Sequence, residues 1–492
     1  MQTQKSSSRR QSSQLRSALL AGAVCAAGAA VPFASLDARQ MPAALVYAIQ
    51  GAKIVTPDAT IDKGNVIMRD GIIEAVGAAA SVPADAVVVD GTNMTLYPGL
   101  IDMTNTAAVE ARPAPPAQQA APQAEARGGR GRGGNPGPVP TWADAERTKR
   151  EALLNPDYNA GEHVKFEGAD MEKLAAAGIT SVLAVPASGL FRGTSALVNV
   201  VAPPDRDDVS QVAGYRRGEV VIASPVAEHV TFDGGRGGGP GYPQALLGDI
   251  AFVRQAFYVA QWQKTARAWS ARHTDQARPD FDPALDALVP ALDRRMPVSF
   301  EADQFREILR ALAMAKEFNL EPIITGGLEA DVAAADLKAA NATVILTLAP
   351  PEPEGGRGGR GDAQPSMRET HVRQNMPKVP AALEKAGVPF AFSSEGLQNP
   401  SDFLRNVTRA VRDGGLTEQQ ALAALTVNAA KIAGAADRVG SLAKGQIANA
   451  ILVEGDLFSD QAKIRRVFVD GRPLDLPPAS GQNAQGRRGG AR

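Results

Sequence analysis

Both ends of the chain show the alternation of apolar and polar positions that is typical of half-buried β-strands. The strand-like runs are short and β-branched, and they cover residues 47–55, 64–71, 72–77 and 86–91 near the N-terminus and residues 448–456 and 464–474 near the C-terminus. Asp70 and Gly71, between two of these runs, are typical of a tight hairpin turn. We therefore expect residues 46–95 and 438–475 to form one small β-sandwich, built from both chain ends.

Between the two ends, apolar strand-like runs alternate with helical patterns. Strands are expected at residues 178–186, 221–225, 296–303, 320–327, 342–348 and 388–396. A long helix is expected from Gln244 to about His273, and an amphipathic helix from Gln304 to Phe318. Alternating strands and helices indicate a parallel sheet that is covered on both faces. The pattern favours an α/β fold in which residues 96–437 form a (β/α)₈ TIM-like barrel.

Segments rich in Gly, Pro, Ala, Gln and Arg interrupt the predicted barrel near residues 112–140, 234–242 and 352–366, and a similar tail follows at 476–492. Such segments cannot bury enough apolar surface to offset the entropy of ordering, so we expect them to be disordered. Their Arg-Gly steps also allow an interpretation as a nucleic-acid tether. We favour simple insertions, because aromatic residues are almost absent from them and the formal net charge of the chain is only -1.

The first 38 residues have the pattern of a signal peptide, although the sequence leaves the cleavage site and the export route open. A basic segment ending at Arg16 precedes an apolar run from Ala18 to Ala30, which is too short to span a bilayer as a permanent helix. We expect a periplasmic or secreted protein without a membrane span. The single cysteine, Cys25, lies in this segment, so the mature chain is expected to have no disulfide and no thiolate metal site.

Several motifs together resemble the amidohydrolase superfamily, and within it the imidazolonepropionase-like branch. They are Tyr97–Met103, Val185–Val198, Val298–Asp303, Ile323–Ala330, Gln420–Gly434 and Arg438–Phe458. In the last motif Gln446 and Asn449 stand where the family has Lys and Asp. The resemblance spans residues 47–474 and implies a barrel with a β-sandwich, and a hydrolase that uses a divalent metal to cleave non-peptide amide or cyclic amide C–N bonds. A fold alone does not establish a function.

The metal-ligand positions implied by the resemblance are substituted in this chain. The two histidines of the first barrel strand fall on Thr104 and Thr106, two later histidines fall on Glu301 and Gly326, and the aspartate of the last strand falls on Glu395. A threonine hydroxyl is a poor ligand for zinc or iron, and glycine has no donor. We therefore predict no metal and no cofactor. Asp102 of the first-strand motif is retained, but it is not one of the paired histidine ligands.

The candidate site lies at the barrel mouth. Glu301 and Glu395 are candidates for acid–base catalysis or for holding a hard cation, but pairing with an arginine or solvation is the favoured interpretation. Arg192 is a candidate contact for an anionic ligand, with an ordinary turn as the alternative. The hydroxyls of Thr104 and Thr106 are expected to bond neighbouring backbone. Asp102 and Gly326 complete the predicted ligand pocket.

Two other groups of residues are interpreted structurally. The histidines of the chain are His163, His229, His273 and His371. We expect them in loops or at helix ends, and none has a second metal ligand at a useful spacing. Trp262 and Trp269, seven residues apart on the long predicted helix, are interpreted as core or helix-packing residues.

Three hypotheses of function follow. The first is an exported amidohydrolase-like protein without the metal site, a non-catalytic homologue that binds a small molecule at the barrel mouth, with a protein partner or a homo-oligomer also possible. The second is an active C–N hydrolase with a non-standard metal or carboxylate site at Glu301 and Glu395. The third is an interaction scaffold that uses the Arg/Gly-rich segments. Neither a nucleic-acid partner nor a metal is predicted.

Overall fold

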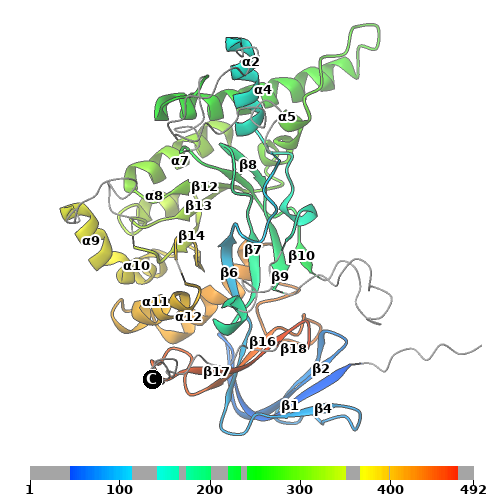
Figure 1. Ribbon diagram of the computed structural model, residues 1–492, viewed down its shortest axis with the longest axis vertical. Coiled ribbons are helices and arrows are strands. Elements are labelled where there is room, and N and C mark those ends of the chain that lie inside the picture. Colours follow the sequence, from blue (N-terminus) through cyan, green and yellow to red (C-terminus); the bar gives the residue numbers. More distant parts are fainter. Residues whose placement is uncertain are drawn as a thin grey trace, which may run out of the picture. The chain divides into compact units, whose positions relative to one another are not determined.

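Both chain ends meet in one eight-stranded sheet, here called the terminal sheet, in the computed structural model (Figure 1). The structure describes residues 45–113, 141–165, 173–200, 220–233, 241–350, 366–397 and 399–474. The N-terminal strands are β1 (Val46–Val55), β2 (Thr60–Arg69), β3 (Ile72–Gly77), β4 (Val87–Asp90) and β5 (Thr95–Pro98). The C-terminal strands are β16 (Ala450–Glu454), β17 (Lys463–Val469) and β18 (Arg472–Leu474).

The terminal sheet has the strand order β18-β17-β16-β5-β1-β2-β3, and β4 pairs with β1. β16 is antiparallel to β5, so the two chain ends join directly by backbone hydrogen bonds. The predicted hairpin turn is confirmed, because Asp70 and Gly71 both have positive φ angles, of 49° and 82°. Both chain ends contribute strands to this one sheet, whereas the predicted β-sandwich stays a prediction.

Two further sheets make up the middle of the chain. One has the order β10-β9-β7-β6 and the other β15-β14-β13-β12-β11-β8. The strands of the first are β6 (Leu100–Asn105), β7 (Ile179–Ala184), β9 (Ala196–Asn199) and β10 (Val221–Ala223). Those of the second are β8 (Phe191–Thr194), β11 (Glu228–Val230), β12 (Val298–Ala302), β13 (Pro322–Gly326), β14 (Thr343–Thr347) and β15 (Phe390–Ser393).

The described strands do not close into a barrel by hydrogen bonding, which corrects the prediction of a complete (β/α)₈ barrel. The chain passes from the second sheet to the first at Ser195, the single residue between β8 and β9. On the other side β15 lies beside β6 without a strand ladder among the described residues. The fold is therefore a mixed α/β fold. β11 to β15 pair in parallel, whereas the first inner sheet has one parallel pair, β6 with β7, and two antiparallel pairs.

A buried carboxylate bridges the seam between β6 and β15. Asp102 on β6 is fully buried and accepts hydrogen bonds from the backbone N–H of Ser394 at 2.8 Å and from its hydroxyl at 2.5 Å. Two helices, α12 (Glu418–Leu425) and α13 (Val427–Ile432), pack against both strands of the seam. Side-chain bonds and helix packing thus replace the missing ladder.

The remaining helices cover the outer faces of the two inner sheets. They are α2 (Trp142–Leu153), η1 (Ala160–Glu162), α4 (Leu246–Ser270), α5 (Pro283–Ala287), α6 (Val289–Leu292), α7 (Phe305–Phe318), α8 (Ala334–Ala339), α9 (Met367–Asn375), η2 (Met376–Lys378), α10 (Val379–Ala386) and α11 (Ser401–Arg412). α7 packs on β12 and β13, and α10 on β15. α7 begins at a capping box of Gln304 and Glu307 and ends at Asn319, whose φ of 55° is left-handed.

Successive residues of the inner strands pack into different apolar clusters, as expected for strands that are buried on both faces. Ile324 on β13 packs with residues of α7 such as Ile308, whereas its neighbour Ile323 packs with Ile345 and Ala391 of the adjacent strands. We call the second group the inner cluster. It also contains Ile101 and Met103 of β6 and Leu183 of β7, so it joins the two inner sheets.

Several sequence predictions are corrected by the structure. The expected helix over residues 420–434 is two helices that break at Thr426. β8, β9 and β11 were not predicted. Trp262 and Trp269 are not core residues, because their exposed fractions are 62% and 45%. Most of the predicted insertions, the signal peptide and the tail lie outside the described residues, but Ser366, at the end of one insertion, caps α9.

No helix among the described ranges is both long and apolar enough to cross a membrane.

We predict that the seam depends on Asp102. Asp102→Ala would leave both donors of Ser394 without their acceptor, which costs about 1–3 kcal/mol for a buried group. Asp102→Asn keeps an acceptor for the Ser394 N–H and should cost less. Urea unfolding followed by circular dichroism measures both variants. An Asp102→Ala protein that unfolds at the urea midpoint of the parent would show that the carboxylate does not hold the seam.

Candidate ligand-binding site

An ion pair between Arg192 and Glu301 lies at the centre of the candidate site. The Arg192 Nη2 atom is 2.6 Å from Glu301 Oε2, and the two side chains are 17% and 37% exposed. Arg192 lies on β8 and Glu301 on β12, with β11 paired between them. The favoured sequence interpretation, that Glu301 pairs with an arginine, is confirmed.

The local backbone explains how β8 presents Arg192. β11 pairs His229 with Gly193 and Val230 with Phe191, so Arg192 is the additional residue of a β-bulge. Gly193 has a φ of 112°, and a side-chain carbon there would lie 2.1 Å from the carbonyl oxygen of Tyr158. Only glycine fits this position, and the bulge that it permits turns Arg192 toward β12.

Asp303 and Glu395 both keep their protons to unusually high pH. Burial and, to a smaller extent, the nearby charge of Glu301 raise the pKa of Glu395 to about 7, while Arg192 opposes the shift. Burial also raises the pKa of Asp303 to about 7, with added repulsion from Glu307 and Glu301. The mutual influence of these groups shows that the structure brings Arg192, Glu301, Asp303 and Glu395 together.

Gly326 lies directly against Asp303. A side-chain carbon at Gly326 would be 2.4 Å from Asp303 Oδ1, and the φ of 109° also disfavours any other residue. Asp303 Oδ1 is buried and has no hydrogen-bond partner among the described residues. Gly326 therefore leaves room for the Asp303 carboxyl group, a role that the sequence did not suggest.

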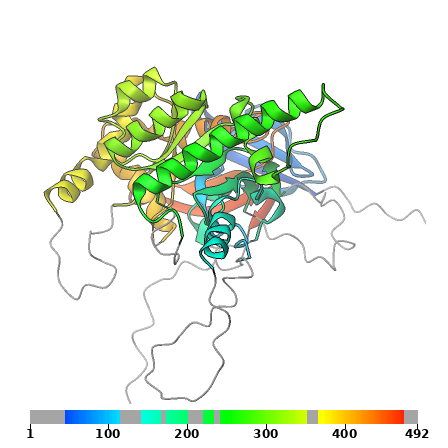
Figure 2. The same cartoon turned by 90° about the horizontal axis from the view of Figure 1, so that it is seen from above.

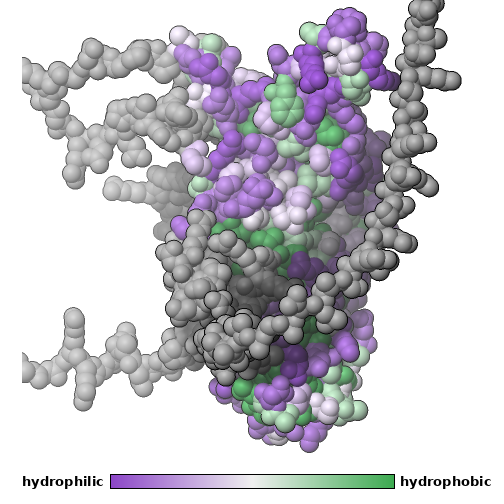
Figure 3. Space-filling view, turned by 90° about the vertical axis from the view of Figure 1, so that its right-hand side faces the viewer, coloured by the Kyte–Doolittle hydropathy of each residue, from purple (hydrophilic) through white to green (hydrophobic). Residues whose placement is uncertain are grey.

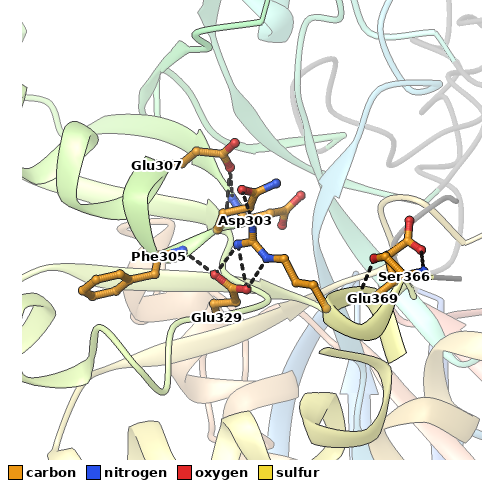
Figure 4. Close-up of polar contacts among 8 residues, drawn as sticks. Asp303, Phe305, Glu307, Glu329, Ser366 and Glu369 are labelled. Carbon is orange, nitrogen blue, oxygen red and sulfur yellow. Dashed lines mark hydrogen bonds and ion pairs between the residues drawn. The ribbon is translucent and has the colours of Figure 1, made fainter. Parts of the chain in front are cut away.

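A second polar network supports the loop that carries Asp303 (Figure 4). The Glu307 carboxylate accepts the backbone N–H of Asp303 at 3.1 Å, and Glu329 accepts that of Phe305 at 2.8 Å (Figure 4). Arg368 of α9 donates to both oxygens of Glu329 at 2.8 Å. These bonds fix the exit from β12 and hold Asp303 in place.

The first-strand motif, with Asp102, Thr104 and Thr106, does not form a set of metal ligands in the described structure. The Thr104 hydroxyl donates to the carbonyl oxygen of Met103 at 2.6 Å, as predicted. Thr106 lies in the bend directly after β6. Burial raises the pKa of Asp102 to about 6, although its hydrogen bonds with Ser394 oppose the shift. The charge of Asp102 also raises the pKa of Glu395, but the hydrogen bonds of Asp102 are made across the seam between β6 and β15.

Two histidines lie elsewhere than predicted, one of them on the unpredicted strand β11. His229 lies on β11 and is buried, and His371 lies within α9, not in a loop or at a helix end. His163 stacks on Tyr158 and His273 on Trp269, both away from β-strands as expected. The run Ala227–Phe232 is short and follows Pro225, which is why its strand pattern was not recognised.

His229 shares the inner face of the sheet with the candidate site. Its register partner on β12 is Ser299, which lies two residues before Glu301 on the same face. Burial lowers the pKa of His229 to about 3, and the positive charge of Arg192 lowers it further, so the imidazole is neutral. Its Nε2 atom has no hydrogen-bond partner among the described residues, and neither does Nε of Arg192.

The described residues contain no group of three or more His, Cys, Asp or Glu side chains arranged to hold a metal ion. What the site does contain is one guanidinium, one ionised partner carboxylate and two carboxyl groups that titrate near pH 7. Such a site can donate and accept hydrogen bonds and can exchange protons at neutral pH.

Comparison with known proteins agrees with this fold. An amidohydrolase family model matches residues 331–474. No curated protein matches the chain. Among solved structures, an amidohydrolase from Thermotoga maritima MSB8 is similar with a TM-score of 0.65 and 21% identity, over 88% of this chain and 100% of that one.

Two prolidases are more distant neighbours. One, in complex with N-methylphosphonate-L-proline, has a TM-score of 0.51 and 15% identity over 88% of this chain and 100% of its own. A putative prolidase from Bifidobacterium longum has a TM-score of 0.50 and 17% identity over 87% of this chain and 94% of its own. The family model thus matches the C-terminal part of the chain, and the solved amidohydrolase and prolidase structures, all below 25% identity, agree with it in fold.

We predict that stability falls as pH rises through the pKa values of the site. The pKa values of Asp303 and Glu395 are about 7 in the folded chain, against 3.8 and 4.5 for the free groups. Between about pH 4 and 7 the folded state therefore binds more protons than the unfolded state, so the free energy of unfolding falls as the pH rises through this range. Above pH 7 both groups are ionised in both states, and the free energy of unfolding stops falling. Glu395→Gln should be more stable than the parent by about 3 kcal/mol at pH 8 and equal to it at pH 4.

The matched control is Glu384→Gln on the exposed side of α10, which should leave the pH profile unchanged. Urea midpoints measured from pH 4 to pH 9 provide the comparison. A Glu395→Gln profile that runs parallel to the parent profile would mean that Glu395 is not a protonated group of the folded site.

Proposed function

We propose that this chain is a non-catalytic, ligand-binding homologue of amidohydrolases, which binds a small polar molecule at Arg192, Glu301, Asp303 and Glu395. The observation that carries the proposal is the ion pair of Arg192 with Glu301. Glu301 occupies a position where the family resemblance implies a metal-binding histidine. In this chain the Glu301 carboxylate at that position is paired with the guanidinium of Arg192, which is a permanent positive charge.

Charge repulsion supports the proposal. Two unit charges about 4 Å apart repel by about 4 kcal/mol at an effective dielectric constant of 20, and a divalent ion would double this value. A metal at Glu301 would have to overcome this repulsion or displace Arg192. The other family positions provide little compensation, because the Thr104 hydroxyl is bonded to backbone and Gly326 has no donor. The residues present do not fit a binuclear metal site.

The chemistry expected of such a site is recognition. Without a metal, water keeps a pKa near 15.7 and is a poor nucleophile at neutral pH. Glu395 can hold or release a proton near pH 7, but without a metal it would have to act on water of ordinary acidity. Arg192 Nε offers a buried donor to an acceptor oxygen of a ligand, and Asp303 Oδ1 accepts or donates according to its protonation.

A second candidate function is an active C–N hydrolase with a carboxylate site. It is favoured by one observation, that Asp303 and Glu395 both titrate near pH 7, which is the range that general acid–base catalysis uses. The solved neighbours include prolidases, but identities of 15–17% carry the fold alone. We rank this function second because its nucleophile is not accounted for.

The proposal includes export. The first 38 residues would act as a signal peptide and direct the mature chain to the periplasm or the exterior. An N-terminal sequence determined on protein from the periplasmic fraction tests this part independently of the site.

We predict that the purified protein contains no stoichiometric transition metal, because Arg192 neutralises Glu301. Mass spectrometry for Zn, Fe and Mn should give well under one ion per chain, both as purified and after incubation with each metal followed by desalting. Arg192→Ala removes the guanidinium and should increase metal retention, whereas Arg254→Ala, which removes an exposed arginine on α4, should not. Parent protein with one or more ions per chain, lost in Glu395→Gln, would favour the hydrolase.

Ligand binding is tested by thermal shift with a panel of small carboxylic acids, amides and amines. We expect at least one compound to raise the melting temperature of the parent by a few degrees at saturating concentration, and to have no effect on Arg192→Ala. The same compound should remain chemically unchanged after prolonged incubation. Turnover of an amide that requires Glu395 would overturn the non-catalytic proposal.

A further inference from the structure

The longest helix of the described structure carries an exposed aromatic stripe. α4 has 25 residues, and Leu247, Tyr258, Trp262 and Trp269 are 81%, 52%, 62% and 45% exposed. Figures 1 and 2 show α4 as the long green helix on the outside of the neighbouring elements. The four positions are separated by 11, 4 and 7 residues, so they lie on one side of a helix with 3.6 residues per turn.

Such a stripe is unusual on a surface that is otherwise polar. The upper part of the face in Figure 3 is mainly hydrophilic, with hydrophobic residues only in small patches. Single exposed apolar residues need no explanation, but a contiguous patch marks an interaction site. The other side of α4 packs inward through Val253, Phe257 and Ala260, which are buried. Tyr258 also donates to Glu317 at 2.9 Å and packs edge-on against Phe318, and Trp269 stacks on His273, but these contacts leave about half of each ring exposed.

We propose that α4 forms an antiparallel, two-fold symmetric dimer interface with α4 of a second copy of this chain, with Tyr258 at the symmetry axis. In a two-fold antiparallel pair, each residue that lies n positions before the axis faces the residue n positions after it on the partner. Leu247 and Trp269 lie 11 positions before and after Tyr258, so each Leu247 faces Trp269 of the other copy.

The same symmetry matches the other positions of the stripe. Arg254 and Trp262 lie four positions to either side of Tyr258, which places a guanidinium beside an indole ring. Ala251 and Thr265 lie seven positions to either side and are small enough for the helices to approach to about 8–10 Å. The two Arg254 side chains are about 12 Å apart along the axis at 1.5 Å per residue, and each is already paired with Glu317.

The stripe supplies about half of the area that each partner buries in a dimer interface of standard size. A fully buried aromatic side chain removes about 150–250 Å² from water, so the four stripe residues offer roughly 400–500 Å² on each copy. A stable interface of standard size buries about 800 Å² per partner. The stripe provides the apolar core, and the exposed Gln255, Gln261 and Thr265 beside it form a polar rim. An unrelated partner would not require this matching about Tyr258.

Sedimentation tests the oligomeric state of the full chain. We expect the parent to be a dimer at micromolar concentration. Tyr258→Asp places two negative charges face to face at the axis and should weaken dimerisation at least 100-fold without changing the circular dichroism spectrum. The control Val332→Asp changes a residue that is 62% exposed away from α4 and should leave the dimer intact. A parent that stays monomeric at tens of micromolar overturns the proposal.

Cysteine cross-linking tests the register in a Cys25→Ser background, which removes the only native cysteine. Tyr258→Cys should give a disulfide dimer under mild oxidation, because a disulfide needs Cα atoms within about 7 Å. Leu247→Cys and Trp269→Cys should each fail to cross-link alone but should cross-link when mixed. Cross-linking of Val332→Cys instead, or of Leu247→Cys with itself, would show a different interface and overturn the proposal.

Discussion

The hydrogen bonds from Ser394 to Asp102 hold β15 against β6, and the position of the candidate site depends on this contact. β6 and β15 lie side by side without a ladder among the described residues, so no backbone bonds fix their spacing. A buried carboxylate that accepts two bonds from one residue supplies that constraint. Because Glu395 follows Ser394 directly, the same contact fixes Glu395 relative to Arg192, Glu301 and Asp303. The penalty is the burial of Asp102, whose pKa is raised to about 6.

The candidate site is governed by a balance of charge. Four acidic groups lie near one another, and Arg192 neutralises only Glu301 directly. Burial is the main cause of the raised pKa values of Asp303 and Glu395, both about 7, and the negative charge of Glu301 adds to both. A divalent metal would relieve it in another way, but the histidine donors of the family are replaced and a guanidinium occupies the centre. The geometry therefore suits a ligand that hydrogen-bonds with neutral acids and an arginine.

The exposed side of α4 and the Arg192 site are built from different kinds of residue. α4 packs against the core with one side and carries large aromatic residues on the other, where Tyr258, Trp262 and Trp269 stay 52%, 62% and 45% exposed. The Arg192 site, by contrast, depends on small residues. Gly193 permits the bulge that presents the arginine, and Gly326 leaves room for Asp303. Binding at the mouth and association through α4 are thus carried by separate residues, and each can be changed without the other.

The sequence by itself determined the strands of both chain ends, the hairpin at Asp70 and Gly71, the helices α4 and α7, and most inner strands, because periodicity and turn residues are local signals. It also pointed to Arg192, Glu301 and Glu395, which the structure brings together, but not to Asp303. Only the tertiary structure decided that Glu301 pairs with Arg192, since a β-bulge on a strand with no clear periodicity turns the arginine inward. Likewise His229, the protonation of Asp303 and Glu395, and the exposure of Trp262 and Trp269 depend on which elements pack together. Burial and the proximity of charges arise from contacts between residues distant in sequence, and local pattern does not contain them.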